Sequence, residues 1–181
     1  YKEEEQKEKN ALDEMYSKIL VAGDSKVTLT MEQLDEYIKR KIDENNSNKV
    51  SIKATSSKTY TTNSTSDGVK VNLDNIIGDT KNKFSIENGN IKIEKGIKRI
   101  LVTGFVNAKS NEANQALQMY ILKNNEIISS DWNRTPSTEE LCRVIPFPVV
   151  IDVNEGDYIS VKVMDWGGGG TFSACNLMIY E

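Results

Sequence analysis

The chain has 181 residues, of which 38% are hydrophobic and 28% are charged, and its formal net charge is −4. These values are ordinary for a globular protein, and the length suffices for one well-cored domain plus an appendage. The acidic excess lies within residues 1–46, and the remaining residues carry equal numbers of acidic and basic side chains. The sequence therefore gives no indication of a basic surface that would bind nucleic acid. No apolar run approaches the roughly 20 residues that cross a bilayer.

The sequence contains no histidine, which is the commonest general base and the commonest zinc ligand. Ser-His and Cys-His nucleophile pairs are therefore excluded. Adjacent acids such as Glu139 and Glu140 are typical of a solvated surface, and a glycosidase pair is the weaker interpretation. We expect a protein that is not an enzyme and that uses no cofactor. Because the chain opens at Tyr1 in a charged run, we also expect it to be part of a longer protein.

Two helices are predicted in residues 1–46. In the first, four apolar residues fall at three- and four-residue steps, which indicates a short coiled-coil seam: Leu12, Met15, Ile19 and Ala22. The second begins after Thr30, with Gln33 in the capping-box position, and carries one apolar stripe: Met31, Leu34, Ile38 and Ile42. So narrow a stripe cannot form a core alone. We expect a self-associating helical stalk, with cover by a neighbouring domain as the alternative.

Residues 47–66 are dominated by Ser, Thr and Asn. This composition predicts a polar linker, with a strand near its end. The alternative is a short extended spacer that pairs strands between chains, because VSIK and KTYTT alternate weakly.

From residue 67 onward the pattern is that of an all-β domain. Asn88-Gly89 and Asn124-Asn125 tolerate positive φ and predict two tight hairpins. Pro146 and Pro148 cannot donate to a central ladder, which predicts two strands or a bent edge strand there. Roughly eight to ten strands without helical periodicity indicate an antiparallel sandwich over residues 67–181.

Several of these strands are apolar on both sides. The clearest are residues 100–106, residues 116–122 and the end of the chain, residues 171–181. A strand with this pattern is buried on both faces. The domain must therefore be covered on surfaces that a simple sandwich leaves in water.

Three stretches carry a resemblance to a known family: NGNIKIEKGIKRILVTGFVNA (88–108), MYILKNNEII (119–128) and VVIDVNEGDYISVKV (149–163). In order and spacing they resemble the jelly-roll domain of the complement-globular-head and tumour-necrosis-factor superfamily, in the version found at the ends of bacteriophage fibres. Gly156 and Asp157 match the Gly-Asp element of such domains. The resemblance covers residues 68–181 and implies a mainly β chain, with a jelly-roll head after the helical stalk.

The resemblance also implies a homotrimer in which the second apolar faces form the subunit interface. The candidates in the head are Leu101, Phe105, Tyr120, Leu177, Ile179 and Tyr180. The expected function is that of a virion protein, a phage fibre or decoration protein, attached to other virion proteins through its N-terminal side. Its head would face a bacterial cell-surface glycan or protein. The alternatives are a secreted or spore-surface module and, less favoured, a fibre-borne depolymerase.

Four residues are candidate receptor contacts. Trp132, Asn133 and Arg134 lie in a predicted loop and could form a carbohydrate platform, and Trp166 precedes four glycines. Packing of either tryptophan against the sandwich is the alternative. No metal site is expected, although the acids Asp152, Glu155 and Asp157 could hold calcium as in some related domains. The two cysteines, Cys142 and Cys175, are expected to be buried in strands, with a disulfide as the alternative.

Overall fold

The computed structural model describes residues 30–63, 68–78 and 80–181. The chain divides between Asn48 and Lys49 into two compact units. The predicted seam residues Leu12, Met15, Ile19 and Ala22 lie outside the described residues. Within the described ranges, no helix is long and apolar enough to span a membrane.

The first unit contains the helix α2 (Met31–Asn48), which runs further than predicted. The predicted capping box is present: the Thr30 amide donates to Oε1 of Gln33 at 3.0 Å, and the Gln33 amide donates to Oγ1 of Thr30 at 3.3 Å. These two bonds satisfy amides that a helix start leaves unpaired. The apolar stripe of α2 is partly or fully exposed, and Ile42 is 53% exposed.

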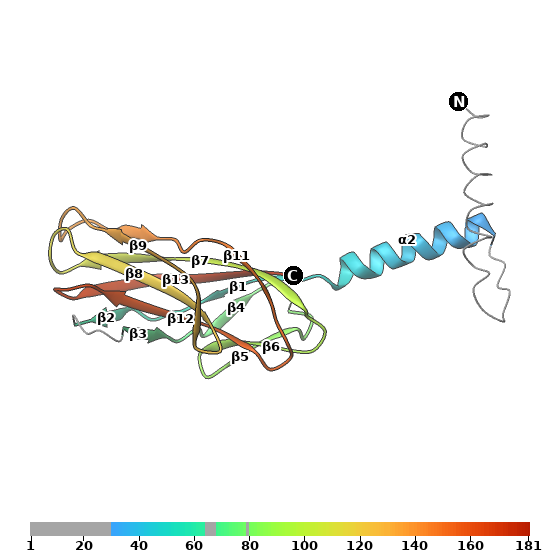
Figure 1. The fold of residues 1–181 in the computed structure, drawn as a ribbon, viewed down its shortest axis with the longest axis horizontal. Coiled ribbons are helices and arrows are strands. Elements are labelled where there is room, and N and C mark those ends of the chain that lie inside the picture. Colours follow the sequence, from blue (N-terminus) through green and yellow to red (C-terminus); the bar gives the residue numbers. More distant parts are fainter. Residues whose placement is uncertain (1–29, 64–67, 79) are drawn as a thin grey trace, which may run out of the picture. The chain divides into compact units, whose positions relative to one another are not determined.

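The second unit, which we call the head, is a sandwich of two antiparallel sheets (Figure 1). Sheet A has seven strands among the described residues: β1 (Ser51–Thr55), β2 (Tyr60–Thr62), β4 (Asn75–Ile77), β7 (Arg99–Ser110), β10 (Cys142–Val144), β11 (Val149–Asp152) and β13 (Gly170–Tyr180). Sheet B has six: β3 (Val69–Val71), β5 (Phe84–Glu87), β6 (Asn90–Ile93), β8 (Ala116–Lys123), β9 (Glu126–Arg134) and β12 (Tyr158–Asp165).

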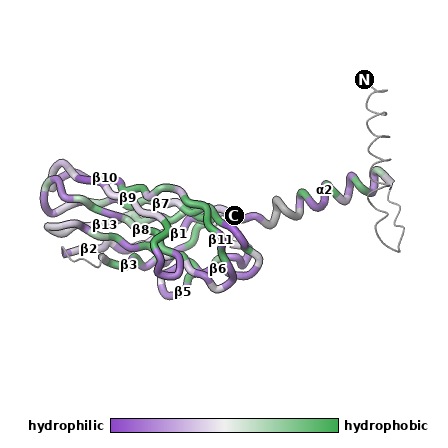
Figure 2. Tube along the Cα trace, in the orientation of Figure 1, coloured by the Kyte–Doolittle hydropathy of each residue, from purple (hydrophilic) through white to green (hydrophobic). Residues whose placement is uncertain are grey.

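The core lies between the two sheets and follows from strict alternation along the long strands. In β7 the even-numbered positions are buried and the odd-numbered ones are partly or fully exposed. Figure 2 shows the hydrophobic stretches of the head concentrated along the strands. Fully buried large side chains from both sheets meet in this layer, among them Phe172, Leu177 and Ile179 of sheet A and Leu117, Met119 and Ile159 of sheet B. The predicted mainly β sandwich of two antiparallel sheets is confirmed.

The predicted hairpins form at their predicted turns. Asn88 and Gly89 have φ of 52° and 75°, and Asn124 and Asn125 have φ of 49° and 71°. Pro146 and Pro148 separate β10 from β11, and both short strands pair with β7, so the prediction of two strands there is correct.

The prediction of a linker over residues 47–66 is wrong where β1 lies, whereas the strand predicted near its end is present as β2. Strand β1 lies between β13 and β4 inside sheet A, with Ile52 and Ala54 buried in the core. The polar residues of this strand occupy the outward positions, so its composition resembles that of a linker. A second difference concerns Trp132, Asn133 and Arg134, which belong to strand β9 and not to a loop.

Candidate functional site

The outward face of sheet A carries a row of apolar side chains. Leu101 of β7 lies between Val150 of β11 and Tyr180 of β13 in the strand register. Together with Lys49, Lys98 and Glu181 they line a groove of about 550 Å³. Further along, Phe105 has the Arg143 guanidinium stacked 4.4 Å from its ring centre. The face offers apolar surface that the protomer does not cover.

Of the interface candidates in the head, Leu101, Phe105 and Tyr180 lie on this face. Leu177 and Ile179 do not: both are fully buried between the sheets, so they have no surface to offer a neighbour. The sequence did not indicate which side of β13 faces the core, because β13 is apolar on both sides and a bulge between Ser173 and Asn176 shifts its register. Tyr120 is partly exposed on sheet B, the sheet opposite Leu101.

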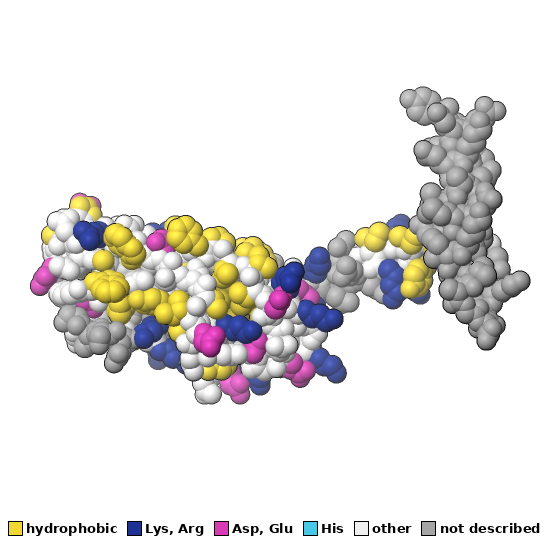
Figure 3. Space-filling view, in the orientation of Figure 1, with side chains coloured by type: hydrophobic (Ala, Val, Ile, Leu, Met, Phe, Trp, Pro, Cys, Tyr) yellow, Lys and Arg dark blue, Asp and Glu magenta, His cyan; other side chains and the backbone are white. Residues whose placement is uncertain are grey.

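A second apolar surface lies at the edge formed by β10 and the segment before β11. Phe147 is 72% exposed, and Leu141 and Ile145 are also exposed. The Ser129 hydroxyl donates to the Phe147 carbonyl oxygen at 2.6 Å, which holds this segment against β9. Figure 3 shows hydrophobic side chains on the surface along the border of the head where β9 and β11 lie in Figure 1.

The outward face of sheet B carries a pocket in place of an apolar row. Two tryptophans that are separated in sequence meet here: Trp132 from β9 and Trp166 from the turn after β12. The pocket has a volume of about 290 Å³ and is completed by Ala116, Gln118 and Arg134. The Arg134 guanidinium carbon lies 5.3 Å from the centre of the Trp132 ring, within the range of a cation–π contact.

A hydrogen-bond network fixes the floor of the pocket. The indole Nε1–H of Trp166 and the hydroxyl of Tyr120 both donate to Oε1 of Gln118, each at 2.7 Å. Burial raises the pKa of Tyr120 above its ordinary value, so the hydroxyl remains a donor at neutral pH. Gln118 is itself nearly buried. Trp166 is thus held in place although its ring is exposed.

The first three of the four glycines after Trp166 form a tight loop that positions it, and Gly170 begins β13. Gly167, Gly168 and Gly169 all have positive φ, and Oδ1 of the buried Asp165 accepts the Gly167 and Gly169 amides at 3.0 Å each. A Cβ on Gly169 would lie 2.8 Å from the Thr62 carbonyl oxygen. The run is therefore required by turn geometry and close packing. Its path was not predictable from the sequence.

Three of the four candidate receptor residues come together in this pocket, and the fourth does not. Asn133 donates from Nδ2 to the Arg143 carbonyl oxygen at 3.1 Å, and its Oδ1 accepts the Arg134 amide. Its side chain therefore links β9 to β10. Sequence reasoning missed Gln118, which lies beside Trp132 only because β8 pairs with β9 in that register.

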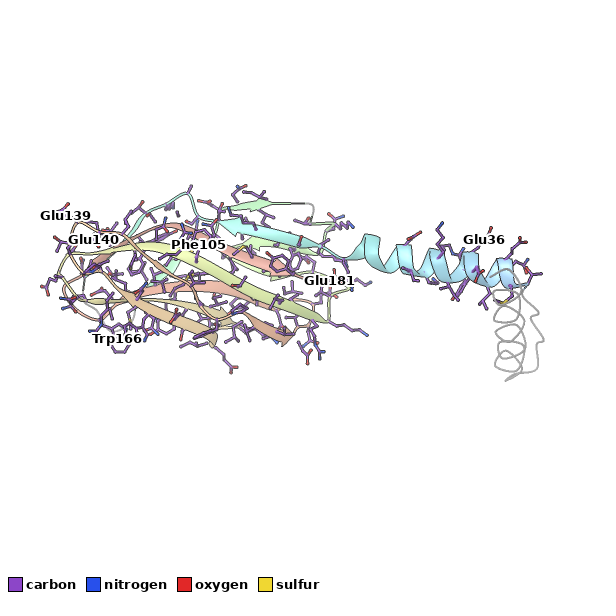
Figure 4. The ribbon with its side chains drawn as sticks, turned by 90° about the horizontal axis from the view of Figure 1, so that it is seen from above. Glu36, Phe105, Glu139, Glu140, Trp166 and Glu181 are labelled. Atoms are coloured by element: carbon purple, nitrogen blue, oxygen red, sulfur yellow. The ribbon has the colours of Figure 1, made fainter. Side chains whose placement is uncertain are left out.

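The pocket lies at one end of the head. Trp166 is at the same end as Glu139 and Glu140, and Glu181 is at the opposite end (Figure 4). The chain enters the head beside Glu181, whose amide donates to the Val50 carbonyl oxygen at 2.9 Å. The tryptophan pocket is therefore at the end of the head away from its N-terminal entry.

Two of the three acids considered for calcium, Asp152 and Asp157, are held by other partners. Asp152 pairs with Arg99 at 2.7 Å, and Asp157 accepts bonds from Asn124 and from the Asn154 amide. Within residues 30–63, 68–78 and 80–181, no cluster of three ligating side chains could hold a metal. Glu139 and Glu140 are exposed, and Glu139 lies 3.8 Å from Lys109.

Both cysteines are free and lie in strands, as predicted, but only Cys175 is buried as expected, and Cys142 is partly exposed. Burial raises the pKa of Cys175 to about 12. Burial also raises the pKa of the partly exposed Cys142, by more than a backbone hydrogen bond lowers it. Neither thiol is a reactive thiolate at neutral pH.

Neither a protein-family model nor a curated protein matches this sequence. Solved structures match its fold. Murine APRIL at pH 5.0 superposes with a TM-score of 0.57 and 10% identity, over 74% of this chain and 98% of that one. Murine APRIL at pH 8.0 gives 0.55 and 10% over the same shares. Eiger TNF from S. frugiperda gives 0.53 and 8%, over 74% and 92%. The head therefore has the jelly-roll fold of tumour-necrosis-factor-like proteins.

Proposed function

We propose that the chain is a homotrimeric structural protein of a bacteriophage particle, a fibre or decoration protein whose head attaches to the bacterial surface. It carries out no catalysis. The observation that carries the proposal is the presence of two exposed apolar surfaces on one protomer. One is the outward face of sheet A, and the other is the edge that contains Phe147.

Two different surfaces of this kind favour a ring. A two-fold interface uses the same patch on both subunits, whereas a heterologous contact joins one patch to a different one and closes into a ring when the rotation fits. In the proposed trimer, the edge around Ile145 and Phe147 packs on the neighbour's face around Leu101 and Tyr180. Apolar patches rimmed by polar groups mark such contacts in proteins.

The helix α2 is consistent with the same symmetry. Met31, Leu34, Ile38 and Ile42 recur at three- and four-residue steps, and the stripe remains partly or fully exposed. Three copies of the helix would bury these stripes against one another. This side of the chain would join other virion proteins.

The attachment role rests on the position and chemistry of the tryptophan pocket. It lies at the end of the head opposite the entry of the chain. Exposed aromatic rings with a few polar groups are typical of ligand sites. Three such pockets on one trimer, and several trimers on one particle, would turn weak single-site binding into durable attachment.

Sedimentation equilibrium of the full chain at micromolar concentration tests assembly. We expect three times the chain mass of 20.3 kDa. A monomer or a dimer under these conditions would overturn the trimer. Attachment is tested by binding of the fluorescently labelled full chain to a panel of bacterial strains, and binding to none of them would overturn that part of the proposal.

A further inference from the structure

The unpaired polar side-chain groups that line the pocket between Trp132 and Trp166 are all hydrogen-bond donors, and this restricts what the pocket can bind. Two donors, the Trp166 indole N–H and the Tyr120 hydroxyl, converge on Oε1 of Gln118. The amide orientation is thereby fixed, because Nε2 could not accept either bond. In the described part of the chain, nothing accepts the two hydrogens of Nε2, so Gln118 offers donors to a ligand.

Arg134 is the second polar group of the pocket lining. Its guanidinium lies over the Trp132 ring, and among the described residues no carboxylate pairs with it. Stacking on the ring leaves the planar fork of N–H donors free at its edge.

The two indoles supply the apolar part of the site. Trp132 is 52% and Trp166 is 63% exposed, so ring surface on both is open to a ligand. A ligand that fits must present a flat apolar face to an indole and acceptor oxygens to Arg134 and Gln118. Carboxylate and phosphate oxygens suit an arginine fork best, because both can accept two parallel bonds.

We infer that this pocket binds an acidic saccharide. The C–H face of one sugar ring would pack on an indole, and its carboxylate or phosphate would accept bonds from Arg134 and from Nε2 of Gln118. The inference rests on the proposed attachment function and names its ligand class. A neutral sugar fits less well, because a hydroxyl offers the Arg134 fork a single uncharged acceptor oxygen, whereas a carboxylate or phosphate accepts two parallel charge-assisted bonds.

The chain has only two tryptophans, and both line the pocket, so indole fluorescence reports on this site alone. The full chain is titrated at constant ionic strength with D-glucuronic acid, D-glucose 1-phosphate and D-glucose. We expect the tighter acidic sugar to bind at least about 10-fold more tightly than glucose. The two acidic sugars distinguish a carboxylate from a phosphate as the recognised group.

Gln118→Glu is the decisive variant. The carboxylate still accepts from Trp166 and Tyr120, but its second oxygen replaces a donor with an acceptor and adds a negative charge. We expect the Kd for both acidic sugars to rise at least about 10-fold, with the sedimentation mass unchanged. Arg134→Gln should have a similar effect. Lys95→Gln, in the exposed turn after β6, removes the same charge elsewhere and should change nothing.

Equal affinity for glucose and the acidic sugars would overturn the inference, and so would an unchanged Kd in Gln118→Glu. Tetraglutamate that binds as tightly as the sugars would indicate an acidic peptide and would also overturn it. Cell binding separates this test from that of the proposed function. If Gln118→Glu attaches to host cells like the wild type, attachment stands and the ligand assignment fails. If the wild type attaches to no strain, the proposed function fails, and the titration still decides the pocket.

Discussion

The two outward faces of the head are built on the same strand alternation and differ in what they leave uncovered. On sheet A, three neighbouring strands place apolar side chains side by side on the outward face, as Val150, Leu101 and Tyr180 show. On sheet B, the corresponding positions around Gln118 hold hydrogen-bonding groups and two indoles.

This difference teaches how one fold can separate assembly from recognition. An apolar row gains free energy from another apolar surface of complementary shape, because burial of apolar area is not directional. A pocket with a fixed amide and a free guanidinium gains from one ligand of matching geometry. In the head, the two kinds of surface lie on opposite sheets, so a substitution on one face should leave the other intact.

The largest effect is expected for Leu101→Asp on the outward face of sheet A. In the proposed trimer each subunit would bury an unpaired carboxylate, which costs about 3–5 kcal/mol per site. We expect the sedimentation mass to fall from three chain masses to one, with the circular dichroism of the head retained. Leu122→Asp, at a partly exposed position of β8 on sheet B, is the matched control and should remain trimeric. If the two variants behave alike, the contrast between the faces fails.

The next largest effect concerns the inner side of the same sheet. Leu177→Ala removes a fully buried side chain, and we expect the free energy of unfolding to fall by about 2–5 kcal/mol. Urea denaturation measures the loss. Ile127→Ala, on β9 at a largely exposed position, should change it by less than about 0.5 kcal/mol. A small loss for Leu177 combined with dissociation of the trimer would return this residue to the interface.

The sequence predicted the parts of this fold that local chemistry determines. The Asn88-Gly89 and Asn124-Asn125 turns were predictable because each pair itself tolerates the positive φ that a tight hairpin needs. The capping box at Thr30 was predictable for the same reason, since both of its partners lie within one turn.

Features that depend on distant pairing were not predictable. Strand β1 is polar in composition and is a strand because β13 and β4 flank it. Which side of β13 faces the core could not be read from a strand apolar on both sides, and the bulge with Ala174 at a φ of 48° alters the alternation. The two tryptophans were each recognisable as candidate contacts. Their meeting over Gln118 required the pairing of β8 with β9 and the path of the glycine loop.

A smaller effect is expected in the loop that supports the sheet B pocket. Gly169→Ala places a Cβ against the Thr62 carbonyl oxygen at a φ of 82°, so the loop must shift and Trp166 with it. We expect a loss of stability of about 1–3 kcal/mol and a changed tryptophan emission, with the trimer mass unchanged. Gly156→Ala is matched in φ, at 90°, and has no atom within 4 Å of the added Cβ. This variant should lose stability because of its positive φ, and its tryptophan emission should not change. Identical emission changes in both variants would mean that the loop does not position the indole.

The smallest effect is expected at Asp157, which lies on neither of the two outward faces. It tests whether the stability of the head depends on pH. Burial raises the pKa of this carboxyl, but bonds from Asn124, from the Asn154 amide and from Lys123 lower it more, so its net pKa is below the ordinary value. A lowered pKa in the folded state means that the carboxylate stabilises the fold above the unfolded pKa of about 3.9, and that this contribution disappears as the pH falls through the folded pKa.

Asp157→Asn should therefore lower the Tm at pH 7 and have a Tm that approaches the wild-type value as the pH is reduced below 4. Differential scanning calorimetry across this range measures the two curves. A constant gap between them at all pH values would show that the charge of Asp157 does not contribute, and that only its hydrogen-bond geometry holds the turn between β11 and β12.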